Sequence, residues 1–306
     1  MRHGSRPDAG RSAMVRGALV AVLLAGGAVG CAGDGEADTT DRPPRPTTPA
    51  AAVNRAAEES ESITSLRYEV RGTVSGRGRL EAEATMTAQP STLSMTQTGE
   101  AYRGLRLETR FVDGAMYASG SLLRSDKLVG RKKWVTAAPA VWGGGAIENQ
   151  SYLMVPRQLE GSPLVQSTLL TGSRDVKLIG TDKVRGKDAP HYRGTVTYDG
   201  LIASLKTGKT GKAGESGGAG EDAGTRRFDH FLNLEVADPL TMDLWLDPDG
   251  RPLQFRMRAA YDKKNAGQDL GPLDLTVTFL EIDPRTSIKA PPPDTVIPLK
   301  DSARRD

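Results

Sequence analysis

The sequence is poor in the residues from which covalent links and metal sites are built. Its 306 residues include one cysteine, Cys31, and three histidines. A single cysteine excludes an intramolecular disulfide, so packing alone must hold the folded part together. Beyond residue 30 only His191 and His230 remain, without a second thiol or a His-Glu-x-x-His pattern. We therefore expect neither a metal nor a cofactor, and we interpret both histidines as structural or surface residues.

Long apolar runs are also lacking. The most apolar run, Gly17–Val29, spans 13 residues, whereas a membrane-crossing helix needs about 20. Four arginines precede this run and small residues end it, which is the pattern of a secretory signal peptide. The start codon could be Met1 or Met14, because Met14–Gly30 forms a compact signal by itself. The sequence thus predicts a signal peptide over residues 1–30.

The end of the apolar run resembles a bacterial lipobox. It reads Ala28-Val29-Gly30-Cys31, with Ala28 in the place of the usual leucine. In a lipobox the cysteine receives diacylglycerol and becomes the new N-terminus, so the resemblance implies that Cys31 is the lipid attachment site. It also implies a lipid-anchored protein at the extracytoplasmic face of the cell membrane. The alternative is an ordinary cleaved signal followed by an incidental cysteine.

An excess of one charge is absent from the chain beyond the leader. The whole sequence carries a net +3, and residues 1–30 hold four arginines and one aspartate, also +3, so the remainder is close to neutral. A neutral domain argues against binding to nucleic acid or to membranes through a polybasic patch. We expect no nucleic-acid partner.

Composition divides the rest of the chain. Residues 31–50 hold many Pro and Thr and little to bury, so we interpret them as the lipidated N-terminus and a tether. Residues 51–299 have the length of a single domain. Within it, residues 207–225 form a Gly-rich stretch that we expect to be a flexible insertion, and residues 300–306 form a C-terminal tail.

Alternation of apolar and polar residues dominates the predicted domain and indicates antiparallel strands with one covered face. Usual strand lengths predict about ten strands. Helix formers occupy Ala50–Ile63, and short apolar segments without alternation follow at 152–159, 163–170, 201–206 and 228–236. The alternating apolar positions include Leu66, Tyr68, Val70, Leu80, Ala82, Ala84, Met86, Leu105, Leu107, Phe111, Met242, Leu244, Leu246, Phe255, Met257, Leu273, Leu275, Val277 and Phe279.

The apolar faces of about ten strands present more surface than a few short helices can cover. The sheet must therefore curl around something. Either the helices fill the curl, or they cap an apolar hollow. Large aromatic side chains are few, with five Phe and three Trp, which favours the hollow although Leu and Met also fill cores well.

Several short motifs, taken in order, resemble the LolA-like lipoproteins of actinobacteria, the lipid carriers of the LppX, LprA, LprF and LprG type. The resemblance spans about residues 55–295 and implies an α+β fold. In that fold a strongly curved antiparallel half-barrel sheet has short helices over its concave face, with acyl chains held between them. The motifs are Val112-Asp113-Gly114 with Met116-Tyr117 and Lys133-Trp134-Val135, Gly180–Gly186 with His191-Tyr192, Leu244–Asp247 with Gly250, and Ile288–Pro292.

The leading functional hypothesis is a monomeric lipoprotein that binds or carries an acyl lipid or glycolipid in the hollow without catalysis. The alternative is a protein-binding or sensory module with a filled core and an unidentified envelope partner. An enzyme is disfavoured, because Gly214–Gly218 matches Gly-x-Ser-x-Gly only within the Gly-rich stretch. The apolar residues of the capping segments are candidates to line the hollow, although they would equally serve a dry core: Leu153, Val155, Leu159, Leu164, Leu169, Leu170, Leu201, Ile202, Phe231 and Leu232.

Overall fold

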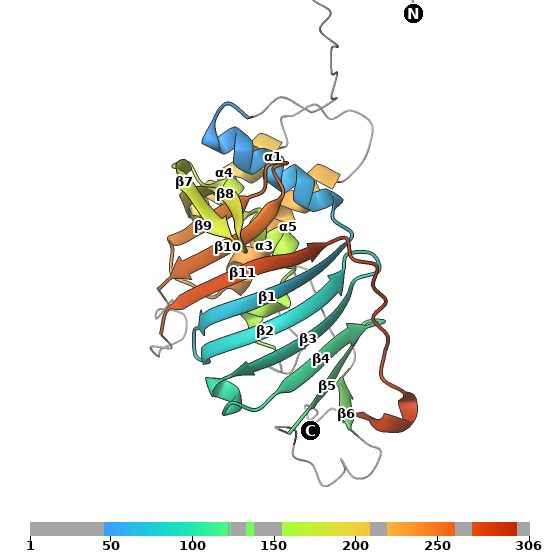
Figure 1. Ribbon diagram of the computed structural model, residues 1–306. Coiled ribbons are helices and arrows are strands. Elements are labelled where there is room, and N and C mark those ends of the chain that lie inside the picture. The colour runs from blue at the N-terminus through green and yellow to red at the C-terminus, as the bar shows by residue number, and fades with distance from the viewer. Residues whose placement is uncertain are drawn as a thin grey trace, which may run out of the picture. The chain divides into compact units, whose positions relative to one another are not determined.

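Figure 1 shows the computed structural model of the chain. The residues described are 46–121, 123, 133–137, 155–208, 219–260 and 271–298, with the side chains of 206–208 and 219–222 left aside. Cys31, Leu153 and the middle of the Gly-rich stretch lie outside these ranges.

One sheet of twelve strands dominates the described residues, in the order β12-β6-β5-β4-β3-β2-β1-β11-β10-β9-β8-β7. The prediction of about ten strands was too low. β3 places Gln97 among its apolar positions, and β12 has only three residues, so neither shows clear alternation. The strands are Ser65–Val74 (β1), Gly78–Thr87 (β2), Thr92–Gly99 (β3), Leu107–Val112 (β4), Ala115–Gly120 (β5), Trp134–Ala137 (β6), Lys177–Val184 (β7), Lys187–Val196 (β8), Leu240–Leu246 (β9), Pro252–Ala259 (β10), Leu273–Ile282 (β11) and Val296–Pro298 (β12).

Strand pairing is antiparallel throughout the described sheet except between β12 and β6, which are parallel. The first strand pairs with the late strand β11 at the middle of the sheet, where Val70 lies opposite Val277. This pairing joins the meander β1–β6 to the meander β7–β11, and Figure 1 shows the two side by side. The result is one open, curled sheet.

The helices are short and gather near the β7–β11 end of the sheet (Figure 1). They are α1 (Pro49–Ser62), α2 (Arg157–Glu160), α3 (Pro163–Ser167), α4 (Tyr198–Gly208) and α5 (Ala219–Asn233), with 3₁₀ turns η1 (Glu100–Tyr102), η2 (Leu169–Gly172) and η3 (Pro293–Thr295). The predicted helix Ala50–Ile63 agrees closely with α1. Its start follows from Thr48, whose side chain accepts a hydrogen bond from the Ala51 N–H at 3.2 Å. α5 begins inside the Gly-rich stretch.

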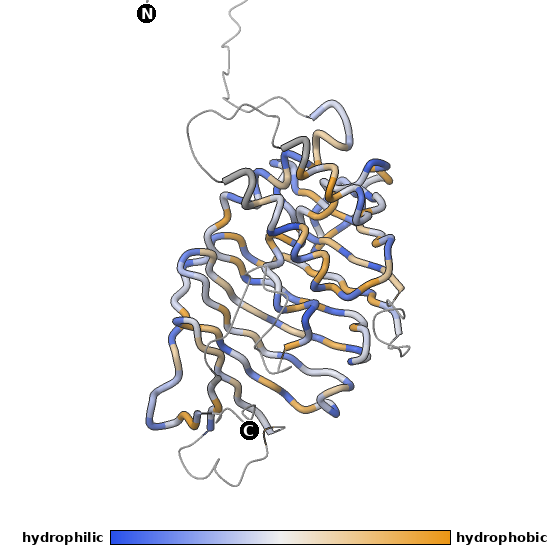
Figure 2. Tube along the Cα trace, turned by 180° about the vertical axis from the view of Figure 1, so that it is seen from behind, coloured by the Kyte–Doolittle hydropathy of each residue, from blue (hydrophilic) through white to orange (hydrophobic). Residues whose placement is uncertain are grey.

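One face of the sheet is buried, and we call it the inner face. It carries alternate strand residues such as Tyr68, Val70, Ala82 and Ala84, each less than 9 % exposed. Helical residues belong to the same core, among them Val53, Leu159, Leu164, Leu169 and Phe231. Figure 2 shows the helices in front of the upper strands on this side.

The opposite face, the outer face, is polar. Arg67 illustrates it by pairing with Glu83 at 3.1 Å and with Glu281 at 3.5 Å on the two neighbouring strands. These side chains are 41 to 63 % exposed, so the pairs stabilise little by themselves. They do keep this part of the outer face hydrated.

Candidate functional site

Seven of the ten residues predicted to line a hollow are buried, with at most 6 % exposure. Ile202 is half-buried, and Leu232 is exposed at 38 %. Leu153 lies outside the described residues. The buried seven, all in the same core as the inner-face residues, are Val155, Leu159, Leu164, Leu169, Leu170, Leu201 and Phe231.

The space between the α2–α3 segment and the sheet is narrow. A void of about 10 Å³ lies there, close to the smallest volume that holds one water molecule. Of the predicted lining residues only Leu159 borders it. The void is lined by Tyr68, Val70, Gln158, Leu159, Gly161, Pro163, Gln166, Leu275 and Val277, so the helical layer sits directly on β1 and β11.

Two glutamines in this lining are satisfied within the protein. Gln158 Nε2 donates to the Leu234 carbonyl at 3.0 Å, and Gln166 Nε2 donates to the Gln158 carbonyl at 2.8 Å. These bonds tie α2 to α3 and to the end of α5. One amide N–H of each glutamine is thus used to fix the helical layer.

Tyr68 differs from the glutamines. Its side chain is 2 % exposed, and its hydroxyl has no hydrogen-bond partner in the part of the chain that the structure describes. Burial raises the pKa of Tyr68 well above its ordinary value. The phenol is therefore a neutral donor within an otherwise apolar stretch of the inner face.

His230 of α5 lies over the turn between α2 and α3. A Cβ atom added to Gly161 would come within 2.2 Å of its Nδ1, so the imidazole ring packs directly on this glycine. The ring is 3 % exposed, and neither nitrogen has a hydrogen-bond partner among the described residues. Burial, together with the positive charge of Arg226, lowers the pKa of His230 to about 4.

Sequence reasoning missed Tyr68 and His230 as site residues. Tyr68 stood in an apolar alternation and counted only as a core residue. The available signal was its hydroxyl, which is the single polar group among Leu66, Tyr68 and Val70. A burial pattern cannot reveal whether such a hydroxyl forms a hydrogen bond, because the acceptor or donor would come from helices far away in the sequence.

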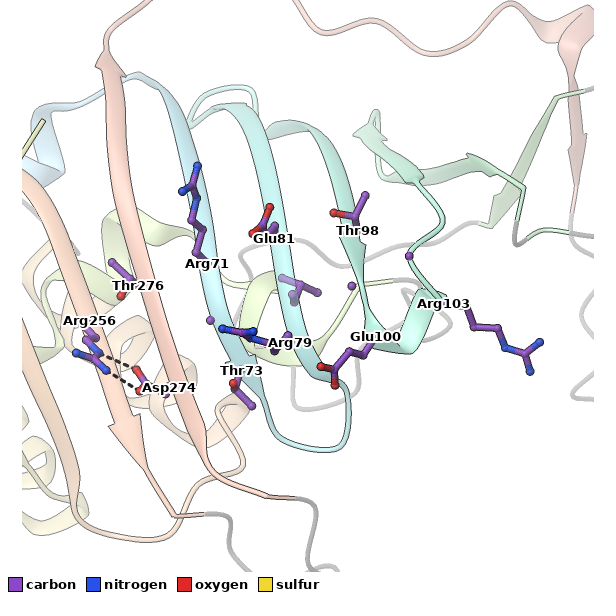
Figure 3. A pocket seen from close by; sticks show the side chains of 14 residues that line it. Arg71, Thr73, Arg79, Glu81, Thr98, Glu100, Arg103, Arg256, Asp274 and Thr276 are labelled. Carbon is purple, nitrogen blue, oxygen red and sulfur yellow. Dashed lines mark hydrogen bonds and ion pairs between the residues drawn. The ribbon is translucent and has the colours of Figure 1, made fainter.

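A second depression lies on the outer face, across β10, β11, β1, β2 and β3 (Figure 3). Its volume is about 1060 Å³, and its lining is mostly charged or hydroxyl-bearing. Arg256 and Asp274 form a bidentate pair across it, at 2.7 and 2.6 Å. Arg103 points away from the other labelled side chains in Figure 3. An acyl chain placed here would strip water from ionised groups, so this groove does not suit an apolar ligand.

A buried carboxylate organises the outer face of β8–β10. Asp243 is 1 % exposed and accepts hydrogen bonds from Arg193 at 2.6 Å and from Arg258 at 2.7 Å. His191 Nε2 lies 2.7 Å from Asp243 Oδ1, so the imidazole is a third polar neighbour of this carboxylate. Burial alone would raise the pKa of Asp243, but the bonds from His191, Arg193 and Arg258 hold it below its usual value.

The other side of His191 is occupied as well. Its Nδ1 lies 2.9 Å from Asp182 Oδ2, and its ring stacks on Trp245 with centroids 4.2 Å apart. Trp245 Nε1 donates to the same Asp182 oxygen at 2.9 Å. The two carboxylates meet opposite nitrogens of one ring and do not converge on a common point. Within the described ranges, no group of three or more His, Cys, Asp or Glu side chains is placed to hold a metal ion.

Among the described helices, none is both long enough and apolar enough to cross a membrane.

Comparisons with known proteins give structural similarities. No protein-family model matches the chain, and no curated protein matches it. The chain is similar to the Mycobacterium tuberculosis lipoprotein LppX, with a TM-score of 0.44, 13 % identity, and coverage of 79 % of this chain and 98 % of LppX. For LprF from Mycobacterium bovis the TM-score is 0.45 and the identity 12 %, with 79 % and 96 % covered. LppX and LprF are two of the proteins whose motifs the sequence resembles.

A third similarity is to a chain of the Pseudomonas aeruginosa MucA/MucB complex. Its TM-score is 0.31 and its identity 17 %, and the match covers 80 % of this chain and 59 % of that one.

Proposed function

We propose that this chain is a cell-envelope lipoprotein that binds or carries an acyl lipid or glycolipid against the inner face of its sheet, without catalysis. The observation that carries the proposal is a pair of small residues on this face, and we call the strip along them the furrow. Ala82 and Ala84 are successive inward residues of β2. Val70 and Tyr68 of β1 flank them on one side, and Gln97 and Met95 of β3 flank them on the other. Small residues between larger ones leave a track suited to a thin apolar chain.

The surroundings of the furrow are apolar and adaptable. Met86 and Met95 border it, and Met116 lies further along the same face, each at most 3 % exposed. Methionine is unbranched and adjusts its shape at low cost, so these side chains can move aside for a ligand. With a void of only about 10 Å³ under α2–α3, binding an acyl chain requires such movement.

The energetics of transfer suit a carrier. Moving an acyl chain from water into an apolar site stabilises it by about 0.8 kcal/mol per methylene. A chain already in a bilayer has that benefit, so exchange between bilayer and protein is nearly balanced. A carrier of this kind needs no nucleotide to load or unload.

We further propose that Cys31 carries the lipid anchor after removal of residues 1–30. Residues 31–50 would then tether the domain, residues 51–299, to the extracytoplasmic face of the cell membrane. The Pro and Thr content of this segment supports an extended tether.

The experiment that tests lipid binding is organic extraction of the purified full-length protein from an actinobacterial host, with the extract analysed by mass spectrometry. The matched variant is Ala84→Phe, which fills the furrow. We expect an acyl lipid in the wild-type extract at near-stoichiometric amount and a loss of at least fivefold in the variant. Circular dichroism should show that the variant remains folded.

The narrow void favours a second candidate, a protein-binding or sensory module with a filled core. A free sheet edge adds to it, because β7 exposes Leu178 and Ile179 at 53 and 48 %. This candidate predicts equal and negligible lipid in wild type and Ala84→Phe. That result would refute the carrier proposal.

A further inference from the structure

Buried polar atoms without partners are uncommon in native proteins, and each calls for an explanation. Tyr68 carries such an atom at the void, and His230 carries two behind the glycine that lines it. Tyr68 lines it from β1, and His230 packs on Gly161, which lines it from the α2–α3 turn. Neither side chain has a hydrogen-bond partner among the described residues. Tyr68 therefore presents an unused hydrogen-bonding group at the void, and His230 presents one next to it, behind Gly161.

The neighbouring groups offer few further partners at this point. Gln158 and Gln166 each donate one amide proton to a backbone carbonyl, which leaves each of them a second amide N–H. The remaining lining residues Val70, Leu159, Pro163, Leu275 and Val277 are apolar. A polar group entering this void would thus meet the Tyr68 hydroxyl directly, with the His230 ring behind Gly161.

The position of Tyr68 connects this point to the furrow. Tyr68 lies directly opposite Ala84 in the register of β1 and β2. A ligand with its polar end beside Tyr68 can therefore extend its chain over Ala84 toward Met95, the next residue in the same cross-strand row. The polar end of the ligand would then meet a hydrogen-bond donor, and its apolar chain would meet apolar side chains.

Resting on the proposed function, we infer that Tyr68 and His230 bind the polar end of the lipid, and that this end carries a carbonyl oxygen, as in an acyl ester or a fatty acid. Both side chains are neutral at pH 7, because burial raises the pKa of Tyr68 and lowers that of His230 to about 4. Each can donate one hydrogen bond, and a carbonyl oxygen accepts two. A hydrocarbon offers no acceptor and would leave both donors unmet.

The test compares three fluorescent probes with the same chain and fluorophore, namely a fatty acid, its methyl ester and the hydrocarbon. They are titrated into the full-length wild type and the Tyr68→Phe variant. We expect the variant to bind at least one of the two carbonyl probes about fivefold more weakly and the hydrocarbon unchanged. The carbonyl probe that responds identifies ester or acid. His230→Leu should reproduce the pattern as a second variant.

The matched control is Tyr102→Phe. Tyr102 is also a buried tyrosine, but its hydroxyl donates to Gln97 Oε1 at 3.1 Å. This variant should lose stability and keep wild-type affinities. Tyr68→Phe should keep its urea midpoint, because it removes a hydroxyl without a partner.

The outcomes separate the inference from the proposed function. In one outcome the wild type binds the hydrocarbon, and neither Tyr68→Phe nor His230→Leu weakens the binding of a carbonyl probe selectively. That outcome overturns the inference and leaves lipid binding intact. An equal loss for all three probes also overturns it, since that reflects packing. Failure of the wild type to bind any probe overturns both.

Discussion

At the scale of single residues, three polar side chains show how burial acts in opposite ways. Asp243 is buried and fully paired with cations, so the pKa of its carboxylate stays below the usual value. Tyr68 and His230 are buried without hydrogen-bond partners among the described residues, and burial keeps both uncharged. Asp243 thus stabilises the outer face, whereas Tyr68 and His230 leave hydrogen-bonding capacity in the core.

The low pKa of His230 predicts a pH dependence of stability. In the unfolded chain a histidine binds its proton near pH 6.5, and in the folded protein His230 does so only near pH 4. The unfolded state therefore holds more protons in this window, so stability is full above about pH 6.5 and falls as pH drops toward 4. The loss reaches at most about 3 kcal/mol.

Urea unfolding of wild type and His230→Leu at pH 7.5 and pH 4.5 measures this effect. The variant should lose markedly less stability between the two pH values. Asp243, whose low pKa also costs stability in acid, is common to both proteins and cancels in the difference. Parallel losses in the two proteins would contradict the assignment to His230.

At the scale of elements, β1 shows why one glycine is required in the centre of the sheet. Gly72 has φ +143°, and a Cβ there would lie 1.9 Å from the carbonyl oxygen of Asp274 on β11. β1 and β11 join the two meanders, so this close backbone approach lies at the junction on which the whole sheet depends. A side chain would force the two strands apart.

Gly72→Ala should therefore destabilise the protein by about 3 kcal/mol, combining backbone strain with the clash. Gly186 provides the control, because it also has a positive φ, +81°, but a Cβ there would meet nothing within 4 Å. Gly186→Ala should cost only about 1 kcal/mol. Chemical denaturation compares the two, and equal losses would show that the contact with Asp274 is unimportant.

At the scale of the whole molecule, the proposed membrane attachment belongs to the N-terminal segment and the proposed lipid binding to the domain. The inner face and its furrow belong to the domain, whereas the proposed anchor, Cys31, precedes it. A carrier held on a tether of residues 31–50 can meet the bilayer repeatedly without losing its place at the membrane. The local concentration of membrane lipid at the domain is then set by the tether.

Anchoring can be tested by intact mass and detergent partition of the full chain in an actinobacterial host. We expect the wild type to begin at residue 31, to carry a diacylglycerol and to partition into the detergent phase. Cys31→Ala should carry no diacylglycerol. A wild type released into the medium with a free thiol would instead support an ordinary cleaved signal.

Local patterns predicted much of the architecture. Alternation identified the inward residues of β1, β2, β10 and β11, because the two faces of a strand meet different surroundings. Helix formers located α1 to within a residue at each end. The two extra strands, β3 and β12, escaped because Gln97 interrupts one alternation and the other is too short.

The sequence by itself determined the amphipathic sheet, the position of α1 and the pattern of a secretory leader, since each depends on residues close together in the chain. The tertiary structure alone decided the pairing of β1 with β11 and the packing of α2–α3 over Tyr68. It also decided the isolation of the Tyr68 hydroxyl and the meeting of His191 with Asp243. These features depend on strand order and register between distant segments, and neighbouring residues carry no record of which distant atoms will lie within hydrogen-bond reach.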